Sequence, residues 1–119
     1  NFLLVFLGGG VGSMLRYGLS VFTMRYWTWG SFPAGTFLVN LLGCLLIGLL
    51  MGTFSKTEPV ARLLLIIGFC GGFTTFSTFS AENLELWQQE QWASLLIYIV
   101  LSLILGIAAV AGGMFLSRL

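Results

Sequence analysis

One stretch of the sequence, Gly68–Ser80, places two adjacent glycines, five hydroxyl side chains and four phenylalanines inside an otherwise apolar chain. The pair Gly71-Gly72 lowers helix propensity, and the β-branched pair Thr74-Thr75 can hydrogen-bond its own backbone. A hydrophobic segment of this composition is expected to break in its middle. Broken backbone at membrane depth is tolerated only where protein buries it or where it lines a watery cavity, and half-helix ends there bind ions. The stretch therefore indicates an ion-conducting membrane protein.

The composition places the whole chain in a membrane. Of its 119 residues, 58% are hydrophobic and 8% charged, against about 25% charged in a soluble domain. We therefore expect a multi-pass protein of the cell (inner or plasma) membrane. The net charge of +1 offers no basic patch for nucleic acid. Cys44 and Cys70 lie far apart in apolar segments and are interpreted as small buried residues, not as a disulfide or metal pair. The chain begins at Asn1, so a short N-terminal piece is expected to precede it.

Four apolar runs predict an all-α integral membrane protein with one transmembrane domain over residues 1–119. A span needs about 20 residues. The predicted spans cover approximately residues 2–24, 33–54, 62–86 and 93–115. The third span contains the predicted break. Aromatic or polar loops are expected at residues 25–32, 55–61 (which include Lys56) and 87–92. The few basic residues barely orient such a chain under the positive-inside rule.

Small residues recur four positions apart in two of these spans. Gly8 and Gly12 in the first span, and Gly48 and Gly52 in the second, have the spacing that lets another helix approach closely. Four thin spans enclose little volume, so one chain can hardly surround a pore. Self-association is therefore expected, most simply as a twofold dimer.

A few polar side chains lie inside the predicted spans, and each has two interpretations. Arg16 either snorkels to water from near the membrane end or stands at the mouth of an aqueous vestibule. Asn40 either bonds across to a neighbouring helix or donates its amide to an anion. Glu82 either ends a helix in solvent or contributes to the helix face that it shares with Phe79, three residues earlier. Tyr98 and Ser102, one turn apart, either make ordinary interhelical hydrogen bonds or form a hydroxyl track beside a pore.

The residue types favour moving an anion over catalysis. The sequence has no His or Asp, no paired carboxylates within a span and no nucleophile–base pair, so we expect no enzyme. Hydroxyl, amide and guanidinium groups are donors, which suit an anion. Phe76 and Phe79 lie three residues apart, and an aromatic ring has a positive edge that attracts an anion weakly. The alternative is that these phenylalanines are only lipid-facing or core bulk.

Three segments of the sequence resemble the signatures of one known family. The longest is Gly68–Glu82, with the sequence GFCGGFTTFSTFSAE, and the others are Gly35–Gly43 in the second span and Gly9–Arg16 in the first. Their order and spacing are similar to those of the Fluc (CrcB) fluoride channel family over essentially the whole chain. The resemblance implies passive fluoride export through a dual-topology, antiparallel homodimer with two pores. It also implies one structural sodium ion at the dimer centre, held by the backbone carbonyls of Gly71 and Thr74 from both subunits.

The same resemblance assigns roles to side chains. The residues expected along the fluoride path are Phe76 and Phe79 as an aromatic box, Asn40 as the pore amide, Ser77 and Thr78 as neighbouring hydroxyls, and Tyr98 and Ser102 as a polar track. Arg16 matches the vestibule arginine and Glu82 the acidic position after the motif. The sequence departs from the family at Gly106, where a polar group often follows Ser102 by one turn. This departure leaves the length of the polar track open.

Two other readings compete with the fluoride channel. A small multidrug-type exporter also has four spans, but it needs a carboxylate deep in its first span, where this chain has Arg16 and no acid. A non-transporting accessory subunit would pack its glycine faces against a partner. That reading does not explain why a broken, hydroxyl-rich segment is kept at membrane depth.

Overall fold

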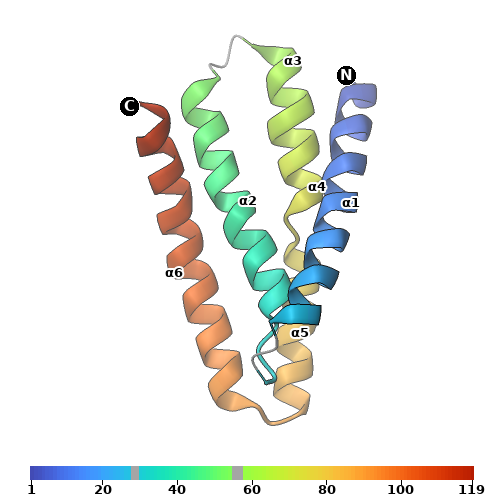
Figure 1. Ribbon diagram of the computed structural model, residues 1–119, viewed down its shortest axis with the longest axis vertical. Helices are drawn as coiled ribbons and strands as arrows, with labels where there is room; N and C mark the ends of the chain where they lie inside the picture. Colours follow the sequence, from blue (N-terminus) through green and yellow to red (C-terminus); the bar gives the residue numbers. More distant parts are fainter. Residues whose placement is uncertain (28–29, 55–57) are drawn as a thin grey trace.

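The computed structural model describes residues 1–27, 30–54 and 58–119. In these residues the chain forms a bundle of four long helical segments, called rods below (Figure 1). The elements in chain order are α1 (Phe2–Tyr26), α2 (Ala34–Thr53), α3 (Pro59–Ala61), the π-helical segment η1 (Arg62–Cys70), α4 (Gly71–Phe73), α5 (Phe76–Gln88) and α6 (Trp92–Ser117). The first, second and last rods are α1, α2 and α6, and α3 to α5 together make the third.

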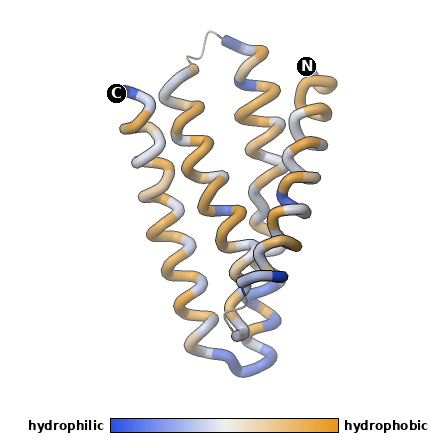
Figure 2. The backbone as a smooth tube through the Cα atoms, viewed as in Figure 1, coloured by the Kyte–Doolittle hydropathy of each residue, from blue (hydrophilic) through white to orange (hydrophobic). Residues whose placement is uncertain are grey.

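Each rod is long and apolar enough to cross a membrane. The four candidate spans in the described residues are Phe2–Tyr26, Ala34–Thr53, Pro59–Gln88 and Trp92–Ser117. Figure 2 shows hydrophobic residues along all four rods, with hydrophilic residues gathered where α5 meets α6. The longest dimension is 48 Å, close to the thickness of a bilayer with its headgroups, about 40–45 Å. The prediction of an all-α, multi-pass membrane protein is confirmed.

The third span is broken, as predicted, and the two threonines form the break. Thr74 (φ −86°, ψ 156°) and Thr75 (φ −149°, ψ 123°) are extended. Thr75 caps the second half-helix, because its Oγ1 accepts a hydrogen bond from the amide of Thr78 at 3.3 Å. Gly71 and Gly72, by contrast, lie within helix α4. The glycines therefore precede the break and do not form it.

The glycines of the first and third spans serve close packing instead. A Cβ added at Gly72 would overlap the carbonyl oxygen of Gly9, and one added at Gly12 would overlap that of Phe69. Gly8 meets the carbonyl oxygen of Leu64 in the same way. Backbone therefore touches backbone where α1 crosses η1 and α4, which is the close approach that the spacing of Gly8 and Gly12 predicts. This contact places α1 directly beside the break.

The second and last spans meet through glycines as well. A Cβ at Gly48 would overlap the carbonyl oxygen of Val110, and one at Gly113 would overlap that of Leu45. Near the end where α5 meets α6, a buried cluster fixes the rods to one another. Its members are Phe32, Ala34, Leu86 and Tyr98, with Phe37, Phe79 and Leu95 packed against it. This cluster anchors α5 and with it the start of the broken segment.

Replacing Gly12 by alanine is expected to lower the free energy of unfolding by about 1–3 kcal/mol, because the methyl group would force two backbones apart. Gly10 is the matched control, since a Cβ there meets nothing within 4 Å. The measurement is the loss of helical circular dichroism on heating in detergent. Equal unfolding midpoints for Gly12→Ala and Gly10→Ala would contradict this packing.

The connections between the rods agree with the expected interfaces where the structure describes them. Trp87 and Trp92 flank the α5–α6 turn with ring centroids 4.8 Å apart, and tryptophan is typical of the membrane–water boundary. Residues 28–29 of the expected aromatic loop, and Lys56 with its neighbours 55 and 57, lie outside the described residues. Both termini lie at the opposite end of the bundle from that turn (Figure 1).

Candidate ion pathway

The break is held by the side chain of Asn40 on α2. Asn40 Nδ2 donates to the carbonyl oxygen of Thr75 at 3.1 Å, and the amide of Thr75 donates to Asn40 Oδ1 at 2.9 Å. The side-chain amide thus pairs with the backbone of Thr75 in both directions, as a neighbouring strand would. One of the two hydrogens of Nδ2 makes this bond, and among the described residues the other is left for a further acceptor. Asn40 does bond across to another helix, and it keeps a donor.

The break redirects two amides away from their helical partners. In an uninterrupted helix the amide of Thr75 would bond the carbonyl of Gly71, and the amide of Thr78 would bond that of Thr74. Here these amides bond Asn40 Oδ1 and Thr75 Oγ1 respectively. The carbonyls of Gly71 and Thr74 are thereby relieved of their helical donors within the described chain. Freed carbonyls at a broken span are suitable ligands for a hard cation.

Hydroxyl groups crowd the start of α5. Thr75 Oγ1 lies 3.2 Å from Thr78 Oγ1 and 3.3 Å from Ser77 Oγ. Thr74, the first residue of the break, donates from its Oγ1 back to the carbonyl oxygen of Cys70 at 2.8 Å. Ser77 is exposed in the single chain. Hydroxyls can act as donors or acceptors by rotation, so the cluster can adapt to an ion that passes it.

A cavity of about 310 Å³ opens beside the break and collects most of the predicted path residues. Its lining comes from α2, the broken third span and α6: Asn40, Gly43, Cys44, Ile47, Cys70, Thr74, Thr75, Phe76, Phe79, Ser102 and Leu103. The walls are mainly apolar, with an amide and several hydroxyls among them. A small number of polar groups on otherwise apolar walls can bind an ion weakly enough to release it again.

Two phenylalanine rings border this cavity. The centroids of Phe76 and Phe79 are 6.0 Å apart, and Phe79 also packs against the ring of Tyr98 at 4.9 Å. Phe79 is half-buried, whereas Phe76 is 78% exposed in the single chain. Phe79 is thus held by a ring of another helix in the same chain, whereas Phe76 points outward from that chain.

Glu82 does not end a helix in solvent. Its carboxylate accepts hydrogen bonds from Tyr98 at 2.9 Å and from Thr36 at 3.0 Å, so both oxygens are bound by hydroxyls. Tyr98 is fully buried, with 0% of its surface exposed. Tyr98 therefore belongs to this carboxylate cluster, while Ser102, one turn on, lines the cavity. The expected polar track on α6 is divided between two places.

Arg16 lies on the other side of the third span. Its Nε donates to the carbonyl oxygen of Gly72 at 3.1 Å, and Ser13 Oγ lies 3.5 Å from the same oxygen. Arg16 is half-buried and does not line the cavity that Asn40 and Phe76 share. Of the predicted path residues, the cavity thus brings together Asn40, Phe76, Phe79 and Ser102. Ser77, Thr78 and Tyr98 are not part of its lining, and Arg16 also lies apart from it.

A family model described as "CrcB-like protein, Camphor Resistance (CrcB)" matches residues 3–114 of this chain. The chain belongs to this CrcB-like family. Among curated proteins it is similar to the "Fluoride-specific ion channel FluC" of Phocaeicola vulgatus, with 49% identity over 120 residues covering 99% of this chain and 98% of that protein. The protein with the same description from Azobacteroides pseudotrichonymphae is 44% identical over 97% of this chain and 94% of its own length. The family consists of membrane channels, not of enzymes.

The contacts of two further positions in this CrcB-like chain are seen only in the structure. Thr36 lies one turn before Asn40 on the same face of α2, a spacing that signals a polar patch but does not identify its partner, Glu82. Gly106, where the chain departs from the family pattern, faces Cys44, whose Sγ would be 3.6 Å from an added Cβ. Gly106 also lines a smaller cavity together with Asn40 and Ser102.

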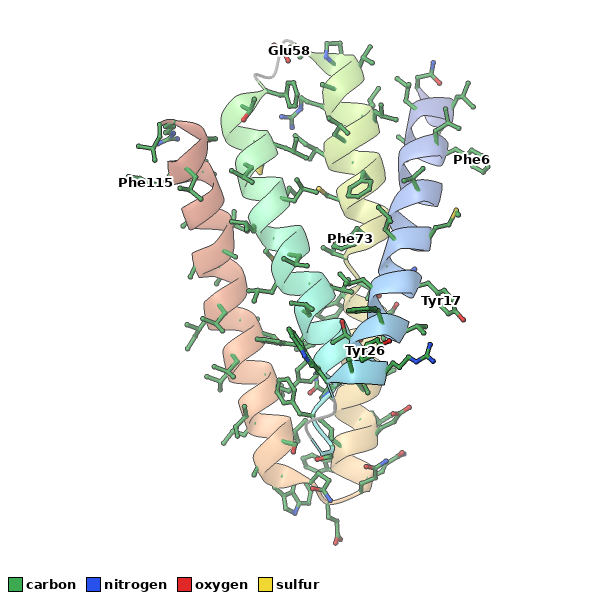
Figure 3. All side chains as sticks on the ribbon, in the orientation of Figure 1. Phe6, Tyr17, Tyr26, Glu58, Phe73 and Phe115 are labelled. Atoms are coloured by element: carbon green, nitrogen blue, oxygen red, sulfur yellow. The ribbon has the colours of Figure 1, made fainter. Side chains whose placement is uncertain are left out.

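Replacing Tyr98 by phenylalanine is expected to destabilise this CrcB-like protein by about 1–3 kcal/mol, because a carboxylate oxygen of Glu82 loses its donor. The ring itself would stay packed against Phe32 and Phe79. Tyr17→Phe is the control, because Tyr17 is 73% exposed and points away from the bundle (Figure 3). Thermal unfolding in detergent measures both variants. A Tyr98→Phe midpoint no lower than that of Tyr17→Phe would show that the hydrogen bond to Glu82 contributes nothing.

Proposed function

We propose that this protein is a fluoride-selective channel that lets fluoride leave the cell passively. The observation that carries the proposal is the cavity beside the break, which combines the Asn40 amide, the Ser102 hydroxyl and two phenylalanine rings. Membership of a family whose curated relatives are described as fluoride-specific ion channels supports the choice of ion.

The selectivity follows from the size and hydration of the ion. Fluoride is small and holds its water strongly, so a series of close donors must replace that water stepwise. Such donors are the second hydrogen of Asn40 Nδ2, the hydroxyls of Ser77, Thr78 and Ser102, and the ring edges of Phe76 and Phe79. Chloride is larger and fits a narrow path poorly. Discrimination between the two ions is then a difference between two free energies of transfer.

The functional unit is a homodimer of antiparallel chains with two pores. Support comes from Phe76, which is 78% exposed beside the cavity and so gives a second chain a ring to pack against. A four-span chain with a weak charge bias can insert in either orientation. A twofold axis in the membrane plane would repeat the cavity, and each pore would then be lined by both subunits.

A sodium ion at the dimer centre completes the proposal. The carbonyls of Gly71 and Thr74 would hold it, and they fit this role because Thr75 and Thr78 direct their amides elsewhere. Twofold symmetry would double these two oxygens to four. The ion would supply a fixed positive charge that joins the two broken spans and favours an anion nearby.

Efflux from liposomes that contain the purified protein tests the proposed function. Fluoride and chloride electrodes are read in parallel, with sodium or with N-methylglucamine as the cation during purification. We expect fast fluoride release with little chloride release, and weaker assembly of dimers without sodium. Folded dimers that release no fluoride, or that release chloride equally fast, would contradict the proposal.

A further inference from the structure

A positive side chain sits against the broken span near the middle of α1, where the membrane makes a charge costly. Arg16 is half-buried, and its Nε bonds the carbonyl oxygen of Gly72 at 3.1 Å. Ser13, one turn earlier, approaches the same oxygen at 3.5 Å. Figure 1 shows α4 beside α1, and the two helices touch through the backbones of Gly72 and Gly9. The guanidinium group therefore contacts the backbone of the third span at the end of its first half-helix.

The carbonyl of Gly72 needs a donor because the helix stops. In a continuous helix it would accept from the amide of Phe76, but Thr74 and Thr75 are extended and begin a new helix there. The last carbonyls of a helix carry partial negative charge and are stabilised by basic side chains. The backbone contact between Gly9 and Gly72 brings α1 close enough for Arg16 to reach.

Two neighbouring helices therefore hold the break by hydrogen bonds, one at each of its ends. Asn40 of α2 pairs with Thr75, at the start of the second half. Arg16 of α1 bonds Gly72, at the end of the first half. Only two extended residues, Thr74 and Thr75, lie between these anchors. The direction in which α5 leaves the break, and so the position of Phe76, depends on both.

We infer that Arg16 is a positioning residue of the ion pathway: it acts by donating a hydrogen bond to the end of α4, and not by presenting its charge to the ion. This role rests on the proposed fluoride conduction for its functional consequence. The mechanical part, that Arg16 orders the break, stands on the geometry alone. The two parts therefore need separate measurements.

Three substitutions separate the hydrogen bond from the charge. Arg16→Gln keeps a donor without charge, Arg16→Lys keeps both, and Arg16→Met keeps the apolar stem alone. Arg25→Met is the control, because Arg25 is exposed near the end of the same helix, above the ring of Tyr26 at 5.9 Å. A variant that only folds less well would reduce the number of active channels. A positioning role instead reduces the fluoride conductance of each one.

Single-channel recording in fluoride is expected to show about three- to tenfold lower conductance for Arg16→Met. This range corresponds to the free energy that one hydrogen bond contributes. Arg16→Gln and Arg16→Lys should both conduct better than Arg16→Met, and Arg25→Met should equal the unmodified protein. Conductance that follows charge, high for lysine and equally low for glutamine and methionine, would overturn the inference. If Arg16→Met does not fold, the comparison of glutamine with lysine still decides.

Hydrogen exchange tests the mechanical part without any ion transport. Peptides that cover residues 73–79 should exchange faster in Arg16→Met than in Arg25→Met, with other segments unchanged. Equal exchange at the break would overturn the inference even if the protein conducts fluoride. An unmodified protein that conducts no fluoride, but in which Arg16→Met loosens the break, would count against the proposed function alone.

Discussion

Replacing Asn40 by alanine is expected to lower the fluoride conductance of each folded channel at least about 30-fold. The change removes both hydrogen bonds that hold Thr75, at 3.1 and 2.9 Å. Each buried backbone group left unsatisfied costs about 1–3 kcal/mol, and about 1.4 kcal/mol corresponds to a factor of ten. The ordered break would thus become less populated, and the pathway would also lose its amide donor.

Single-channel recording in fluoride measures this effect for each channel, independently of expression. Asn83→Ala is the matched control, because the amide of Asn83 donates within its own helix to the carbonyl of Phe79 at 2.9 Å. Asn40→Asp adds a finer comparison. The carboxylate can still accept a hydrogen bond from the amide of Thr75, but it has no donor for the carbonyl oxygen of Thr75. Conductance of Asn40→Ala close to that of Asn83→Ala would mean that the amide neither holds the break nor meets the ion.

Replacing Phe76 by isoleucine is expected to reduce fluoride conductance about tenfold or more while the single chain folds normally. Phe76 is 78% exposed in the single chain, so the loss of its ring removes little packing there. It does remove one of the two rings that border the cavity, and the edge of an aromatic ring carries the positive charge that an aliphatic side chain lacks. Phe79 is a less clean target, because it also packs against Tyr98.

Phe6→Ile is the control for this substitution. Phe6 is 73% exposed and projects outward from α1 (Figure 3), as a lipid-facing ring does. Both variants are compared by fluoride efflux from liposomes at equal protein content, after the dimer fraction has been measured. If both variants release fluoride as the unmodified protein does, then the ring of Phe76 is only bulk at a protein or lipid surface.

Residue types and their spacing were enough to predict the four spans and the break. The apolar runs have bilayer length, and Gly68–Ser80 contains too many hydroxyls and glycines for a smooth helix. The part played by the glycines was harder to predict. Thr74 and Thr75 form the break, whereas Gly72 is helical and lies against Gly9. Low helix propensity and close helix contact both favour glycine, and a single sequence does not separate the two causes.

The partners of the polar side chains depend on tertiary packing. Arg16 bonds Gly72, which is 56 positions away, and Asn40 bonds Thr75, which is 35 positions away. Periodicity places each side chain on a helix face but does not say which backbone group lies opposite. Glu82 shows the same limit, because its hydroxyl partner Thr36 lies on another span. The antiparallel dimer and the sodium ion stay predictions, since they depend on a second chain.

Reversal-potential measurement in a planar bilayer tests passive fluoride-selective conduction most directly. The purified protein is placed between sodium fluoride on one side and sodium chloride on the other. For a fluoride channel we expect a steady current that needs no proton gradient. Its reversal potential should lie far towards the equilibrium potential of fluoride. A current that reverses near the chloride potential, or no current from dimers known to be folded, would contradict a fluoride pathway along Asn40, Phe76 and Phe79.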